Sequence, residues 1–243
     1  MNPPTAILFT AFEPSGDEHA AAVIRQLLKI RPRWKVHALG GPQMAAAGAE
    51  LIENTTQEAV MGTGALAKVR EHRAILRRLA DWWDDHPIAV HVPTDSPAAN
   101  WSICKMAKAR NCRVAHLVAP QVWAWASWRV RRLQRWSDLV LSVLPFETLW
   151  FAERGVEARF IGHPLYDEPL DTDELRWQSV NYPTDEPKIA LLPGSRPGEL
   201  KRNWPVMKSA FERFRQRRPK ACAVVAVRNQ AALKSIRDEL GGL

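Results

Sequence analysis

Short apolar runs alternate with longer helical patterns along most of this chain, and this alternation constrains its fold more than any other feature. Each run has four to six residues, and the segments between runs carry apolar residues at helical spacing. Parallel strands need crossovers of this kind, so the order predicts βαβ units and a parallel sheet covered by helices. The expected strands are residues 7–10, 35–39, 88–92, 113–118, 139–144 and 158–161, and the clearest helices are 17–28, 65–85 and 97–109.

A second region of the same kind begins after an acidic, turn-rich segment at residues 166–185. Its expected elements are a strand at 188–192, a helix at 198–216, a strand at 221–227 and a helix at 230–240. Two strands are too few to bury a parallel sheet, so we expect this second domain to be partial and marginally stable. The expected organisation is a parallel α/β domain at 1–166, a linker at 167–187 and a partial second α/β domain at 188–243.

Three loops at expected strand ends carry polar groups, at residues 13–17, 93–100 and 119–125. Open parallel sheets bind ligands at the carboxyl ends of their strands. Asp95 is placed there to act as a general base on a sugar hydroxyl, or to cap the helix that starts near Pro97. Residues 13–17 put a carboxylate, a hydroxyl and a glycine at a helix start, which favours an anionic ligand or a simple N-terminal cap.

The positive charge of the chain is concentrated in one stretch. Residues 65–136 hold 13 Lys or Arg and five acids, which equals the whole net charge of +8. A localised basic field suits phosphates, nucleic acid or an anionic membrane, and solvated helix faces are the plain alternative. Four of the 11 tryptophans lie at residues 123–136 between arginines. That segment could stack bases, hold an amphiphile or pack as an amphipathic helix.

Several classes of protein are not favoured by the sequence. No apolar run approaches the ~18 residues of a membrane-spanning helix, and Met1 to Pro4 lack the basic start of a signal peptide. Three cysteines predict reduced thiols in a cytoplasmic protein. No Cys/His spacing indicates a metal site, and Asp171-Thr172-Asp173 lies in the acidic linker, so we interpret this metal-binding pattern as chance.

Seven short motifs, in this order and spacing, resemble the lipid-A-disaccharide synthase family. The resemblance extends from Ala6 to about Val227, and its most specific parts are Pro-Gln-Val-Trp-Ala-Trp and Phe-Ile-Gly-His. The motifs are Glu13-Pro14-Ser15-Gly16-Asp17, Gly40-Gly41-Pro42-Gln43-Met44, Ala59-Val60-Met61-Gly62, Pro120-Gln121-Val122-Trp123-Ala124-Trp125, Leu144-Pro145-Phe146-Glu147, Phe160-Ile161-Gly162-His163-Pro164 and Leu192-Pro193-Gly194-Ser195-Arg196.

This resemblance implies an inverting glycosyltransferase with two Rossmann-like domains, the GT-B fold. Such an enzyme transfers 2,3-diacylglucosamine from UDP-2,3-diacylglucosamine to 2,3-diacylglucosamine 1-phosphate (lipid X). The products are the β-1,6 lipid A disaccharide 1-phosphate and UDP. The resemblance also implies a peripheral protein on the anionic cytoplasmic face of the inner membrane, with no metal, no cofactor and no nucleic-acid partner. Its expected protein partner is a second copy of the chain or a separate C-terminal half.

The family's functional residues map onto matching positions of this sequence. Asp95 matches the general base that deprotonates the acceptor 6-hydroxyl. The basic, apolar-faced helix near residues 65–85 suits docking onto anionic lipid. Each basic residue contributes only ~1 kcal/mol, so several are needed. The expected acceptor-binding residues are Glu13, Ser15, Gly16, Asp17, Trp123, Trp125 and His163; the donor-binding residues are Gly194, Ser195 and Arg196; the membrane-facing residues are Lys68, Arg70, Arg73, Arg77 and Arg78.

The chain departs from the family pattern at two positions and in length. Phe12 stands where the family usually has Gly, and Ala98 stands where a second Asp is common, which reduces the charge near Asp95. Two complete Rossmann-like domains need roughly 300 residues, so we expect most donor contacts to be missing from these 243. Two other functions stay open: a non-catalytic protein that binds lipid phosphate or membrane surfaces, and another UDP-sugar enzyme such as a 2-epimerase.

Overall fold

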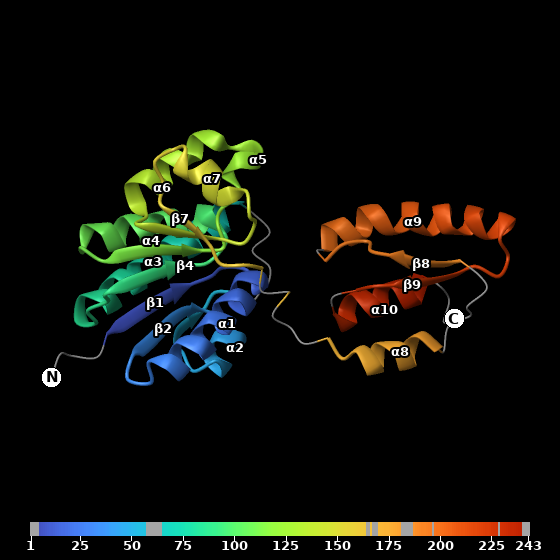
Figure 1. Ribbon diagram of the computed structural model, residues 1–243, viewed down its shortest axis with the longest axis horizontal. Helices are drawn as coiled ribbons and strands as arrows, with labels where there is room; N and C mark the ends of the chain where they lie inside the picture. Colours follow the sequence, from blue (N-terminus) through green and yellow to red (C-terminus); the bar gives the residue numbers. More distant parts are fainter. Residues whose placement is uncertain are drawn as a thin grey trace. The chain divides into compact units, whose positions relative to one another are not determined.

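The computed structural model describes residues 5–56, 65–163, 166, 170–180, 187–195, 197–227 and 229–239, and gives the backbone alone for 65–68. The chain divides into two compact units, Met1–Pro169 and Leu170–Leu243. Figure 1 shows the helices and strands of both units. We describe each unit by itself, beginning with the larger one, because it contains Asp95.

Seven parallel strands form one sheet in the first unit, in the order β3-β2-β1-β4-β5-β6-β7 (Figure 1). The predicted parallel α/β sheet is therefore confirmed. The order reverses between β1 and β4, the kind of switch point at which open sheets place their ligands. The strands are β1 (Ala6–Thr10), β2 (Lys35–Gly40), β3 (Glu50–Asn54), β4 (Val90–Pro93), β5 (Arg113–Leu117), β6 (Leu139–Ser142) and β7 (Ala158–Phe160).

The edge strand β3 has no counterpart among the predicted strands. Its sequence Glu-Leu-Ile-Glu-Asn has charged residues around only two apolar ones, so it lacks a continuous apolar run. A strand at the edge of a sheet is partly exposed and needs less apolar sequence than a central strand. The pattern of apolar runs therefore misses this edge strand, although it predicts β7 at the other edge.

Helices cover both faces of the sheet, as the alternation of elements predicts (Figure 1). Side chains of β1 alternate between the faces, so Ile7 and Phe9 pack with Ile24 of α1, whereas Leu8 packs with Leu79 of α3 and Ile103 of α4. Each fully buried aliphatic or aromatic side chain contributes roughly 1.5–3 kcal/mol relative to exposure. The helical segments of this unit are α1 (Pro14–Ile30), α2 (Pro42–Ala46), α3 (Ala65–Asp85), α4 (Pro97–Ala109), α5 (Val122–Trp125), η1 (Ser127–Arg129), α6 (Val130–Trp136) and α7 (Glu147–Ala152).

Helix α3 has the predicted bounds, but its buried face is shorter than the apolar stripe in its sequence predicts. That stripe consists of Leu66, Val69, Leu76, Leu79 and Trp83. Ile75, Leu79 and Trp83 are buried, whereas Val69 leaves 48% of its surface exposed. The side chain of Leu66, the first residue of the predicted stripe, lies outside the described residues. The first described turns of α3 therefore present an apolar residue and several arginines to solvent.

The second unit pairs two parallel strands, β8 and β9, in register from Lys188–Cys222 to Leu191–Val225. Its elements are α8 (Thr172–Val180), β8 (Lys188–Leu191), α9 (Pro197–Arg217), β9 (Cys222–Val225) and α10 (Gln230–Glu239). Helix α8 lies inside the segment that we expected to be a linker. Asp171 caps α8, because its Oδ1 accepts hydrogen bonds from the backbone N–H groups of Asp173 at 3.1 Å and Glu174 at 2.9 Å. The Asp171-Thr172-Asp173 pattern therefore has a structural explanation.

No helix within the described ranges is both long enough and apolar enough to cross a membrane. The same residues contain no cluster of three or more His, Cys, Asp or Glu side chains arranged to hold a metal ion.

Candidate active site

Parallel strands end at one edge of the sheet, and this edge brings the loops after β1, β4 and β7 towards one another. Asp95 follows β4, and its Oδ2 accepts a hydrogen bond from Ser15 Oγ at 3.3 Å. Ser15 lies in the first turn of α1, 80 residues earlier. The structure therefore brings together two of the residues that the sequence predicts for the site.

The backbone at Asp95 has an unusual conformation. Asp95 and the next residue, Ser96, have positive φ angles of 49° and 38°. The left-handed region costs an L-residue roughly 1–2 kcal/mol, and such strain often occurs at functional sites. Helix α4 starts at Pro97 with Ser96 as its N-cap and has no side-chain cap there. The side chain of Asp95 contacts Ser15 and does not cap α4, so the capping interpretation is not supported.

Gly16 permits the close approach of α1 to β4. A Cβ atom at this position would lie 3.0 Å from Ala11 Cβ, 3.2 Å from the Thr94 carbonyl oxygen and 3.7 Å from Asp95 Cβ. The first two distances are tighter than ordinary van der Waals contact, so a larger residue would push α1 away from β4. Gly16 therefore keeps Ser15 within reach of Asp95.

His19 is a further member of this group that the sequence reasoning missed. It lies four residues after Ser15 on α1, which places both on one helix face. Its ring centroid is 6.2 Å from that of His163, with the two rings edge to face. Burial lowers the pKa of His19, and the charge of His163 acts in the same direction, whereas Asp95 and Glu18 oppose the shift. The spacing from Ser15 was the signal in the sequence that could have identified it.

Asp17 has a structural task instead of an exposed position in the site. Only 2% of its surface is exposed. Its Oδ1 accepts hydrogen bonds from the backbone N–H groups of Gly41 at 3.0 Å and Met44 at 2.9 Å, and its Oδ2 accepts one from Gln43 at 3.0 Å. We therefore remove Asp17 from the expected acceptor contacts. It caps the start of α2 and not α1, because α1 already begins at Pro14 with Glu13 as its N-cap.

Both predicted tryptophans lie on α5. Trp123 contacts the start of α7, and Trp125 contacts Arg129 of η1. Trp123 donates its indole N–H to Glu147 Oε1 at 3.0 Å, and its ring meets that of Phe146 at 4.9 Å. Glu147 is completely buried, and its Oε2 accepts the Leu144 backbone N–H at 3.1 Å. Two of the recognised motifs are thereby joined. Trp125 is 73% exposed and lies against the guanidinium of Arg129, 4.6 Å from the ring centroid.

The predicted donor loop lies in the second unit and contacts Glu199 in the first turn of α9, the helix that follows it. Gly194 has a φ of 115°, and a Cβ there would lie 2.6 Å from Glu199 Cβ. Ser195 donates its backbone N–H to Glu199 Oε2 at 3.1 Å. The third predicted donor residue, Arg196, lies outside the described residues.

The predicted membrane-facing residues lie on α3. Arg70, Arg73 and Arg77 are exposed. Arg78 differs, because its guanidinium forms a two-pronged ion pair with the Glu53 carboxylate of β3, and this pair raises its pKa. The side chain of Lys68 lies outside the described residues.

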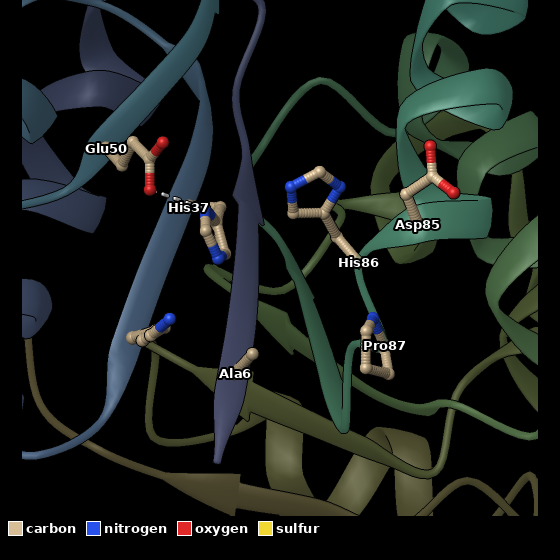
Figure 2. A pocket seen from close by; sticks show the side chains of 7 residues that line it. Ala6, His37, Glu50, Asp85, His86 and Pro87 are labelled. Carbon is tan, nitrogen blue, oxygen red and sulfur yellow. Dashed lines mark ion pairs between the residues drawn. The ribbon is translucent and has the colours of Figure 1, made fainter. Parts of the chain in front are cut away.

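A hollow of about 420 Å³ lies at the opposite edge of the sheet, where the strands begin (Figure 2). His37 points towards Glu50 there, with 3.2 Å between His37 Nδ1 and Glu50 Oε2. Lys35, Glu50 and Asp85 contribute charged groups to the lining of this hollow, and Asp95 lies at the other ends of the strands. This hollow is therefore separate from the candidate active site.

Comparison with solved structures shows that the chain has a GT-B-like fold. UDP-GlcNAc 2-epimerase from Neisseria meningitidis, bound to UDP-GlcNAc, matches 98% of this chain and 70% of its own with a TM-score of 0.64 and 12% identity. The glycosyltransferase of kitacinnamycin matches 93% of this chain and 67% of its own, with a TM-score of 0.57 and 15% identity. Identities this low show the fold alone.

Sequence comparison then defines the family. The model of the lipid-A-disaccharide synthetase family matches residues 7–240. Lipid-A-disaccharide synthase from Myxococcus xanthus is 37% identical over 228 residues, which cover 93% of this chain and 60% of that protein. Lipid-A-disaccharide synthase 2 from Legionella pneumophila (strain Philadelphia 1) is 35% identical over 250 residues, 100% of this chain and 65% of that protein. The chain belongs to the lipid-A-disaccharide synthase family and spans about three fifths of these relatives' lengths.

Proposed function

We propose that this chain takes part in the transfer of 2,3-diacylglucosamine from its UDP derivative to 2,3-diacylglucosamine 1-phosphate, forming a β-1,6 disaccharide. The observation that carries the proposal is the position of Asp95, at the end of β4 with its Oδ2 held by Ser15. That hydrogen bond leaves the other carboxylate oxygen for the 6-hydroxyl of the acceptor. Membership of the family supports this choice of sugars.

In the proposed reaction Asp95 accepts the proton of the acceptor 6-hydroxyl. The freed oxygen attacks the anomeric carbon of the donor from the face opposite UDP. The bond between that carbon and the UDP oxygen breaks, and its electron pair leaves with UDP. One displacement of this kind inverts the anomeric configuration. General-base assistance contributes typically 10²–10⁴-fold to such a step. Ser15, which contacts Asp95, and His163, whose ring contacts that of His19, are the proposed acceptor contacts of the first unit.

Replacement of Asp95 by Asn tests this role. The amide keeps the shape of the side chain but cannot accept the proton, so UDP release from the two diacylglucosamine substrates should fall by about 10²–10⁴-fold. Asp81→Asn, the same change at an exposed carboxylate of α3, should leave the rate unchanged. Asp95→Asn with wild-type turnover would exclude Asp95 as the base. Wild-type protein that binds lipid X without releasing UDP would replace transfer by lipid-phosphate binding as the function of this chain.

We also propose that the first unit docks on the anionic cytoplasmic face of the inner membrane through α3. The support is the set of exposed arginines at 70, 73 and 77 beside the exposed Val69. Each basic residue near an anionic surface contributes ~1 kcal/mol. We give Arg78 a smaller part, because Glu53 already holds its guanidinium.

Vesicle sedimentation tests the docking proposal. Changing Arg70, Arg73 and Arg77 together to Gln should weaken binding to phosphatidylglycerol-containing vesicles by roughly 100-fold, as three contributions of ~1 kcal/mol predict. A matched control makes the same charge change at three exposed arginines of α9: Arg213, Arg215 and Arg217. Equal losses in the two variants would indicate general electrostatic attraction and contradict a specific role for α3.

A further inference from the structure

A line of buried polar groups extends from the centre of the sheet to the backbone of Asp95. Thr10 Oγ1 of β1 lies 2.8 Å from His91 Nε2 of β4 and 2.6 Å from Asn100 Oδ1 of α4. Asn100 Nδ2 then donates to the carbonyl oxygens of Asp95 at 3.0 Å and Ser96 at 3.4 Å. Thr10, His91 and Asn100 are completely buried, so solvent does not compete for these contacts.

The donors and acceptors fix the direction of this line. Thr10 has one hydroxyl proton, and Asn100 Oδ1 can only accept it, so the Thr10 oxygen accepts the proton on His91 Nε2. Burial, assisted by the charge of His116, lowers the pKa of His91 to about 3, so the ring is neutral. His91 Nδ1 is then the unprotonated nitrogen, and it has no hydrogen-bond partner among the described residues. The Asn100 amide oxygen therefore faces Thr10, and its NH₂ group faces the two carbonyls.

The Asn100 amide group holds two adjacent residues with positive φ angles, Asp95 and Ser96. Left-handed backbone at Asp95 and Ser96 persists only where surrounding contacts stabilise it. The Asn100 NH₂ group contacts both of their carbonyls, and the Asp95 backbone N–H donates to the Leu117 carbonyl at 3.2 Å. Such a backbone directs the Asp95 side chain towards Ser15 instead of towards the amide groups of α4.

We propose that Asn100, oriented by Thr10 and His91, is a positioning residue that holds the Asp95 carboxylate in its reactive place. None of the three touches a substrate in this assignment, and all act through the backbone of Asp95. The assignment rests on the proposed function of Asp95. It adds two residues outside every recognised motif, Thr10 and His91, to the machinery of the reaction.

Thr10→Val tests the proposal, because valine has the shape of threonine without its hydroxyl. With the acceptor at saturation, kcat should fall about tenfold with little change in KM, since the base is displaced while the binding surface stays. Thr10→Ser restores the hydroxyl and should keep kcat within twofold of wild type. The matched control is Thr148→Val, which removes a hydroxyl of α7 that contacts Ser142 Oγ at 3.0 Å, outside the line from His91 to Asp95.

A double variant separates positioning from simple loss of stability. Thr10→Val alone leaves the His91 N–H buried without an acceptor, which destabilises the fold, whereas Thr10→Val with His91→Leu removes both polar partners. The double variant should recover the part of the stability that the unpaired His91 N–H costs, while Asn100 Oδ1 still lacks its donor. It should retain the tenfold loss of kcat, because Asn100 is still unoriented. Recovery of kcat together with stability would overturn the proposal.

An NMR measurement keeps this inference distinct from the proposed function. In ¹⁵N-labelled protein, the Asp95 and Ser96 amide resonances should shift in the double variant and stay in place in Thr148→Val. Unshifted resonances would overturn the positioning role even in an active enzyme. Shifted resonances in a chain that shows no transfer would support the positioning of Asp95 and contradict the proposed reaction instead.

Discussion

Two aspartates at the sheet edge, Asp17 and Asp95, differ in what surrounds their carboxylates. Asp95 is half-buried, and its Oδ2 accepts a hydrogen bond from the Ser15 hydroxyl. Asp17 is 2% exposed and accepts three backbone N–H groups from the β2–α2 connection. A carboxylate with this many internal donors stabilises a loop, whereas one that keeps an available oxygen can accept a proton. Both residues have the same side chain, so only their surroundings distinguish the two roles.

Asp17→Asn should destabilise the first unit by about 1–3 kcal/mol, because the amide loses the negative charge and replaces one acceptor oxygen with a donor facing backbone N–H groups. Chemical denaturation, followed by circular dichroism, measures this loss. Asp85→Asn changes an exposed carboxylate at the end of α3 and should alter the free energy of unfolding by less than ~0.5 kcal/mol. Equal stability of the two variants would contradict the structural role of Asp17.

The neighbouring central strands β4 and β5 each carry a completely buried histidine, His91 and His116. Burial lowers the pKa of His116 to about 3, and burial together with the charge of His116 lowers that of His91 to about 3. The His91 ring packs against Trp83 of α3 and the His116 ring against Trp101 of α4, so helices separate both rings from solvent. The thiol of Cys104 lies 3.8 Å from His116 Nε2, and burial raises its pKa to about 12, which makes it unreactive.

These histidines predict a loss of stability as the pH falls below about 6.5. The unfolded chain binds protons at both histidines near that pH, whereas the folded chain does so only near pH 3, so protonation favours unfolding between these values. Each histidine contributes up to ~1.4 kcal/mol per pH unit in this window. Denaturation at pH 7.5, 6.5 and 5.5 measures the slope. His116→Leu should make the slope shallower by about one proton, and an unchanged slope would contradict burial of its ring.

At the scale of the whole chain, the two units differ in how well they bury apolar side chains. The first unit has a seven-stranded sheet covered on both faces, whereas the second has two strands. Among its described residues, the second unit buries Trp204, Ala221 and Ile236. Leu192 and Val206 there leave 65% and 68% of their surfaces exposed. The second unit therefore buries much less apolar area per residue than the first, and this burial stabilises its fold less.

We expect the second unit to open well before the first. Hydrogen exchange followed by mass spectrometry should show faster exchange in β8 and β9 than in β1 and β4, because few buried contacts protect the two-stranded sheet. Trp204→Ala should lower the protection of the second unit alone, since Trp204 is a large part of its core. Equal protection of all four strands, or full resistance of residues 185–243 to limited proteolysis, would contradict this expectation.

The local pattern of the sequence determined the parallel α/β fold, the bounds of α3 and the position of Asp95 at a strand end. Apolar periodicity is a local property that directly reflects burial, so it predicts central strands and long helices well. It predicts short or edge elements poorly, as β3, α2 and α8 show, because their residues are partly exposed or held by side-chain caps. The seven motifs likewise gave the family without any knowledge of contacts.

Only the tertiary structure decided which polar residues at the sheet edge act together. It joined Ser15 to Asp95, added His19, assigned Asp17 to the cap of α2 and linked Asn100 through Thr10 to His91. These partners lie tens of residues apart in sequence, and each has several alternatives of the same chemistry nearby. Hydrogen bonds require donor–acceptor distances that are correct to a fraction of an ångström. These distances arise when strands and helices pack, so no local pattern contains them.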